Sequence, residues 1–134
     1  ELILNGEYFG IYLLMEQIKR SPGRLDIDKM GPMDNQFPYV TGGYIVQINR
    51  ADDAGWYSNH AGISNAGAKP YFQYNYPRAE SISPQQKSYI QSVIDSFETV
   101  LKTPGYSDFK SGYRKFISTG SFIDFMIMNE LSKN

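Results

Sequence analysis

The first fifteen residues are mostly apolar or aromatic, and the clearest polar break among them is Asn5-Gly6. Asn-Gly accepts the positive φ angles of a two-residue type I′ turn, so residues 2–4 and 8–15 are predicted to form a β-hairpin. Both faces of the second strand carry apolar or aromatic side chains, which is typical of a central strand covered on both sides. Gly10 within it indicates close approach by another backbone or by a ligand, and simple packing is the favoured interpretation.

The chain that follows is less regular. A basic, turn-rich segment over 19–24 is followed by alternation over 25–28, which predicts a short extended piece, and then by a surface loop over 30–38 that holds glycine and proline without periodicity. Residues 40–49 are rich in β-branched and aromatic side chains and predict a strand. The pair Gly42-Gly43 indicates a bulge or a tight turn where this strand starts.

Aromatic side chains then fall among asparagine, glycine and serine over 51–80, with Pro70 and Pro77 as breaks, which predicts one irregular hairpin. Two interpretations of the aromatic cluster are open: a stacking surface for sugar rings, or the inside of an irregular β layer. We favour core packing. The cluster consists of Trp56, Tyr57, Tyr71, Tyr74 and Tyr76.

From Ser83 onward the apolar residues recur with helical spacing. Ser83 with Gln86 forms a capping box, Pro84 takes the first helical position, and Thr103-Pro104-Gly105 ends a predicted amphipathic helix of about five turns. The residues on its apolar stripe are Tyr89, Ile90, Val93, Ile94, Phe97, Val100 and Leu101.

A short helix is predicted around 113–117, and a last helix over 122–131 with a capping box of Ser121 and Asp124. The last helix is apolar nearly all round, which suits a helix enclosed on every side. Because the chain also starts with a strand, we expect it to be a piece of a larger domain. Strands come first and helices last, so the predicted fold class is α+β.

The 134 residues suffice for one domain, β-rich over 1–80 and helical over 83–134. The formal net charge of −1 offers no positive field for a nucleic acid, and no apolar run reaches the ~18 residues of a membrane span. The absence of cysteine excludes disulfides and thiolate metal sites.

Few residues carry a recognisable chemistry. The single histidine, His60, lies in a loop, so a zinc site is not expected. Asp26 and Asp28 would share a face of an extended segment and could hold magnesium or calcium, but solvated surface carboxylates are the favoured interpretation. The basic residues Lys19, Arg20 and Arg24 could contact phosphates, although a solvated loop is the simpler interpretation.

Whole phrases of the sequence resemble the spore coat protein H (CotH) kinase family of atypical protein kinases. The most specific phrase is Leu4-Asn5-Gly6-Glu7-Tyr8, followed by Gly10-Ile11-Tyr12, Glu16 and Lys19-Arg20. Further phrases occur in family order: Arg24-Leu25-Asp26-Ile27, Val40-Thr41-Gly42-Gly43-Tyr44-Ile45, Tyr76-Pro77-Arg78-Ala79-Glu80, Phe122-Ile123-Asp124-Phe125, and Asn129-Glu130-Leu131-Ser132-Lys133-Asn134.

The resemblance implies phosphoryl transfer from ATP to protein serine, with magnesium or manganese, by an extracellular or cell-surface protein. It also implies that this chain is the middle of the kinase domain. The lysine for the nucleotide phosphates would precede Glu1, and the catalytic aspartates would lie at or beyond Asn134. We therefore expect no catalytic residue within the chain, no tightly bound cofactor and no transfer activity by the chain alone.

The same layout places residues 12–18 at the edge of the adenine. The candidates for nucleotide contact are Leu14, Met15, Glu16 and Ile18, with Glu16 equally able to pair with Lys19 or Arg20. Two other functions are left open: a pseudokinase, and a surface module that binds glycan or peptide through the tyrosine-rich segment. The partners we expect are the protein substrate of the kinase and, through exposed apolar surface, further copies of the chain.

Overall fold

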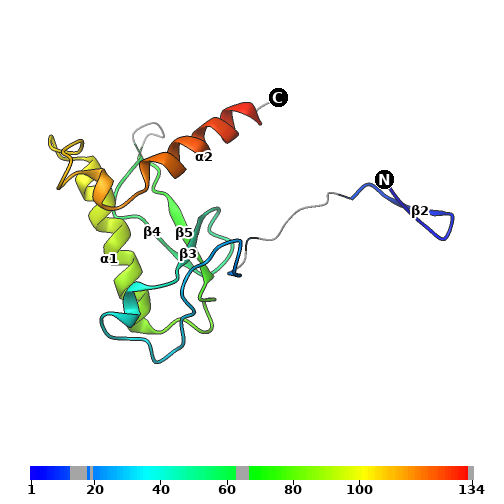
Figure 1. Cartoon of the computed structure of the whole chain (residues 1–134), viewed down its shortest axis with the longest axis horizontal. Helices are drawn as coiled ribbons and strands as arrows, with labels where there is room; N and C mark the ends of the chain where they lie inside the picture. The colour runs from blue at the N-terminus through cyan, green and yellow to red at the C-terminus, as the bar shows by residue number, and fades with distance from the viewer. Residues whose placement is uncertain (13–17, 19, 63–66, 133–134) are drawn as a thin grey trace.

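The computed structural model describes residues 1–12, 18, 20–62 and 67–132. A two-stranded sheet, a three-stranded sheet and two α-helices follow one another along the chain, with two short 3-10 helices (Figure 1). This arrangement confirms the predicted α+β class. The elements are β1 (Leu2–Leu4), β2 (Glu7–Gly10), η1 (Tyr39–Thr41), β3 (Ile45–Ile48), β4 (Gly55–Tyr57), β5 (Tyr71–Tyr76), α1 (Pro84–Leu101), η2 (Tyr113–Lys115) and α2 (Thr119–Leu131).

Strands β1 and β2 form the predicted antiparallel hairpin, although β2 ends at Gly10 and residues 13–15 of the predicted strand lie outside the described residues. Its turn has φ angles of 51° at Asn5 and 83° at Gly6, as the Asn-Gly pair predicts. A bulge interrupts the register, because Leu2 pairs with Gly10 whereas Ile3 pairs with Tyr8. Gly10 has a φ of 110° there, so the glycine serves the backbone conformation of the bulge.

The prediction that the second strand is central is wrong for the described chain. Among the described strands, β2 pairs only with β1, and the side chains of Tyr8 and Phe9 on its two faces are exposed. Figure 1 shows the hairpin apart from the rest of the fold. An apolar pattern on both faces indicates that a strand is suited to cover on both sides, but it does not identify the covering element.

Strand β5 lies at the centre of the three-stranded antiparallel sheet, in the order β3-β5-β4. The pairing of β4 with β5 confirms the predicted irregular hairpin. Strand β3 is shorter than predicted because Val40 is buried in the 3-10 helix η1, and the glycine pair then turns the chain into the strand. Gly43 has a φ of 61°, and a Cβ atom there would lie 1.9 Å from the carbonyl oxygen of Asp28.

Helix α1 begins as predicted, with the Ser83–Gln86 capping box and Pro84 in the first turn. Its rings and polar groups contact the sheet and the segments beside it. Tyr89 stacks on Tyr44 with centroids 6.0 Å apart, and the Gln91 amide donates to the Tyr74 hydroxyl over 2.6 Å. The buried apolar residues are Met30, Val40, Phe72, Ile82 and Ile90.

The most completely buried side chain is polar: Gln86, with 0% exposure. Its Nε2 donates to the carbonyl oxygens of Gly31 (2.7 Å) and Asp34 (3.2 Å), and its Oε1 accepts from the Ser83 backbone N–H over 3.0 Å. The Ser83 hydroxyl also bonds the side chain of Asn35. The segment predicted as a plain surface loop is therefore tied to the first turn of α1.

Helix α2 starts earlier than predicted, at Thr119, because Ser118 and not Ser121 is its cap. The Ser118 hydroxyl accepts from the backbone N–H of Ser121 over 3.5 Å. The sequence predicts a helix suited to cover on every side with part of that cover missing, and in the structure α2 projects from the fold (Figure 1). Its large apolar side chains are between 46% and 68% exposed on all sides of the helix.

We expect Tyr44 to make the stability of the fold depend on pH in the alkaline range. Its hydroxyl donates to the carbonyl oxygen of Val40 over 2.8 Å, and burial, followed by the neighbouring Tyr89, raises the pKa of Tyr44 to about 12. Because this pKa lies above the ordinary value of 10, its stabilising contribution is complete below pH 10 and is lost as the pH rises towards 12. Tyr44→Phe should remove this part of the alkaline loss in unfolding experiments between these pH values. The control Tyr39→Phe, on an exposed ring, should leave it unchanged, and an equal effect of both would contradict the assignment.

Candidate functional site

The residues predicted to contact the nucleotide lie mainly outside the described part of the chain. Leu14, Met15 and Glu16 fall within 13–17, which lie outside the described residues. Ile18 is described and its side chain is 66% exposed. The prediction of a nucleotide edge therefore remains a prediction, and the described site must be built from other residues.

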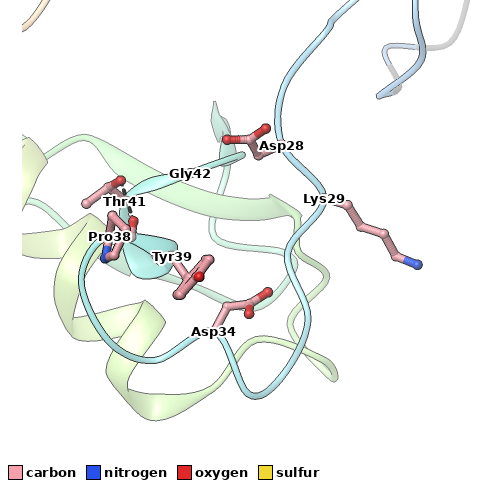
Figure 2. Close-up of a pocket in the computed structure, with 7 residues that line it drawn as sticks. All are labelled: Asp28, Lys29, Asp34, Pro38, Tyr39, Thr41 and Gly42. Atoms are coloured by element: carbon pink, nitrogen blue, oxygen red, sulfur yellow. Dashed lines mark hydrogen bonds between the residues drawn. The ribbon is translucent and has the colours of Figure 1, made fainter.

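A hollow of about 460 Å³ opens between residues 28–29 and the loop that carries η1 (Figure 2). Figure 2 shows the carboxylates of Asp28 and Asp34 on separate parts of its rim and the Lys29 side chain pointing away from it. The Asp34 carboxylate accepts from the Gly31 backbone N–H over 2.7 Å, and the Thr41 hydroxyl donates to Pro38 over 2.6 Å. These contacts shape the loop.

The described residues do not fit a divalent metal. Within the described ranges, no group of three or more histidine, cysteine, aspartate or glutamate side chains lies close enough to hold an ion. Asp26 and Asp28 are exposed and do not lie on a strand, since Leu25 forms only an isolated bridge with Arg20. The favoured interpretation of solvated carboxylates agrees with this placement.

A second, smaller hollow lies between β4 and α1 and contains a network that the sequence analysis missed. Ser58 is only 3% exposed, and its hydroxyl lies 2.8 Å from both carboxylate oxygens of Glu98. The Asn59 amide donates to Asp95 over 2.8 Å, and His60 Nε2 lies 3.4 Å from the same carboxylate. The acidic positions 95 and 98 occupy one side of α1 at the spacing i, i+3, which was the available signal.

The aromatic cluster packs largely on itself, as the favoured interpretation predicted, although Tyr57 is 59% exposed and does not belong to the core. The Trp56 ring lies 5.2 Å from Phe72 and 4.9 Å from Tyr74 between centroids. Tyr57 and Tyr71 form an edge-to-face pair on the opposite face of the sheet, with centroids 4.8 Å apart. The rings of Trp56, Phe72 and Tyr74 therefore belong to the layer between sheet and helix.

Comparison with known proteins identifies the family. The family model described as CotH kinase protein matches residues 1–134, which is the whole chain. This chain belongs to the CotH kinase family. No curated protein and no solved structure matches it. Among the helices that the structure describes, none combines the length and apolarity needed to cross a membrane.

Proposed function

We propose that this chain is part of a protein kinase that transfers the γ-phosphoryl group of ATP to serine hydroxyls of a protein substrate. The observation that carries the proposal is the family match along the entire chain, together with the family phrases distributed from Leu4 to Asn134. Such transfer depends on positioning the substrate hydroxyl and neutralising charge at the phosphates. We also propose an extracellular or cell-surface location, on the same family grounds.

Within that kinase, the 134 residues would form the middle of the catalytic domain, with Leu14, Met15, Glu16 and Ile18 at the edge of the nucleotide. Magnesium or manganese would supply charge neutralisation at the phosphates. Because the described residues offer no cluster of metal ligands, the ligands in this proposal are other residues of the kinase. The described part would contribute the scaffold of sheet, loop and helix.

The test is transfer of labelled phosphate from ATP, with magnesium or manganese, to a serine-containing protein. The full-length polypeptide that carries this sequence should transfer phosphate, whereas the same polypeptide ended at Asn134 and started at Glu1 should not. Transfer by the 134-residue chain alone would contradict the proposal that the catalytic residues lie outside this chain. Absence of transfer by both would favour a pseudokinase or a binding module.

We further propose that the isolated chain self-associates through α2, whose apolar residues are exposed all round. Phe125→Lys places a charge in that surface and should weaken association about tenfold, measured by light scattering over a range of concentrations. Asn129→Lys is the matched control, since it adds the same charge at a polar position of the same helix. A monomer at every concentration in the unmodified chain would contradict the proposal.

A further inference from the structure

The small hollow between β4 and α1 brings together two parts of the chain that are far apart in sequence. Its volume is about 150 Å³, and it lies beside β4 and the two residues that continue it. Figure 1 shows β4 on the side of the sheet nearest to α1. The lining residues are Trp56, Tyr57, Ser58 and Asn59 from the strand side and Gln91, Asp95 and Glu98 from α1.

Strand β4 is an edge strand with backbone groups free to pair. The sheet order places β5 on one side of β4, and no described strand occupies the other. The backbone N–H of Ser58 donates to the Pro70 carbonyl oxygen over 2.8 Å, and the Ala54 carbonyl oxygen accepts from the Tyr74 backbone N–H over 3.3 Å. The backbone groups of these two positions therefore point towards β5. Alternate residues of an antiparallel strand direct their N–H and C=O groups to opposite edges. Gly55 and Tyr57 therefore direct theirs to the open edge.

The helix side of the hollow carries negative charge in a fixed arrangement. The donors bound to Glu98 and Asp95 are the neutral groups of Ser58 and Asn59. Within the described chain, no lysine or arginine forms an ion pair with either carboxylate, and His60 is the one basic side chain within 4 Å of Asp95. Two carboxylates in a defined geometry complement a compact cation.

We propose that this hollow binds an extended peptide, which adds a strand to the open edge of β4 and places one lysine or arginine side chain beside Asp95 and Glu98. Backbone pairing at a strand edge and a pocket for one side chain are the two components of strand-addition recognition. The volume suits a side-chain head group, whereas small-molecule sites usually measure roughly 300–1,000 Å³.

The surrounding contacts hold the hollow in place before binding. Trp56 is fixed by stacking on Phe72 and by a tilted ring contact with Tyr74, and Gln91 is fixed by its hydrogen bond to the Tyr74 hydroxyl. A preformed site loses little conformational freedom when it binds. Because the Trp56 indole already packs on these rings, it is less able to stack on a sugar ring. We therefore favour a peptide over a glycan.

The test uses the 134-residue chain without ATP, so its outcome is independent of phosphate transfer. The probe is a capped pentapeptide, Thr-Val-Lys-Val-Thr, and the comparison peptide has norleucine in place of lysine. Binding measured by calorimetry should be about tenfold tighter for the lysine peptide. The NMR amide signals of Gly55 and Tyr57 should shift when the peptide binds. Methylation of the backbone nitrogens of the peptide should abolish its binding.

Two charge variants and one control identify the site. Glu98→Gln and Asp95→Asn keep the shape and one acceptor oxygen of each side chain while removing its charge, and each should weaken binding of the lysine peptide about tenfold without affecting the norleucine peptide. Glu7→Gln makes the same charge change on the distant hairpin and should have no effect. Equal affinity for the two peptides, no binding of the lysine peptide, or unchanged affinity in both charge variants would overturn the proposal.

Discussion

Replacing Gln86 by alanine is expected to lower the free energy of unfolding by about 3 kcal/mol. The substitution removes the donor to the carbonyl oxygens of Gly31 and Asp34, which both lose this partner at the fully buried position of Gln86. It also removes half of the capping box, the bond from the Ser83 backbone N–H. Urea unfolding followed by circular dichroism would measure the loss.

Gln85→Ala is the matched control for that experiment. Gln85 is exposed, lies one position earlier on the same helix and has the same side chain. Its replacement should change the free energy of unfolding by less than about 0.5 kcal/mol, as is usual for surface positions. Similar losses in the two variants would show that helix propensity, and not the buried amide, determines the stability of this region.

The second large effect is expected at Gly43. Gly43→Ala should destabilise the fold by about 3 kcal/mol, because a Cβ atom meets the Asp28 carbonyl oxygen and the φ of 61° disfavours a side chain. The chain at 28 and the turn before β3 would have to separate. Thermal unfolding would report the loss, and the NMR signals around Asp28 should shift.

Gly67→Ala separates the effect of the positive φ from that of the close contact with Asp28. Gly67 also has a positive φ, of 91°, but a Cβ atom there would meet nothing within 4 Å. Only the backbone strain of about 1 kcal/mol is expected at this position. If the two variants lost equal stability, the close approach to Asp28 would contribute nothing.

The parts of the fold that the sequence predicted correctly are those determined by local chemistry. Asn5-Gly6 defined the hairpin turn, and the Ser83–Gln86 capping box defined the start of α1. Which side chains are buried by elements that lie far away in the sequence could not be predicted from local chemistry. The same Gln86 was recognised as a capping residue, whereas its burial against Gly31 depends on a contact across 55 positions of sequence.

The candidate site also has one part that the sequence predicted and one part that it did not. Family phrases predicted a nucleotide edge at residues that lie outside the described ranges, so the structure leaves that prediction as it was. The network around Ser58 and Glu98 was missed because the i, i+3 spacing of Asp95 and Glu98 shows an acidic side of the helix but does not identify Ser58 as its partner. Only the packing of β4 beside α1 brings these residues within hydrogen-bond distance.

The order of the three-stranded sheet has a consequence for synthesis on the ribosome. The central strand, β5, follows both of its neighbours in sequence, so β3 and β4 leave the ribosome before the strand with which each pairs. At translation rates of about 5–20 residues per second, β3 waits for seconds before residue 76 is made. The nascent chain therefore exposes two unpaired strands, β3 and β4, until β5 emerges. During that interval they could be bound by a chaperone that recognises extended apolar segments.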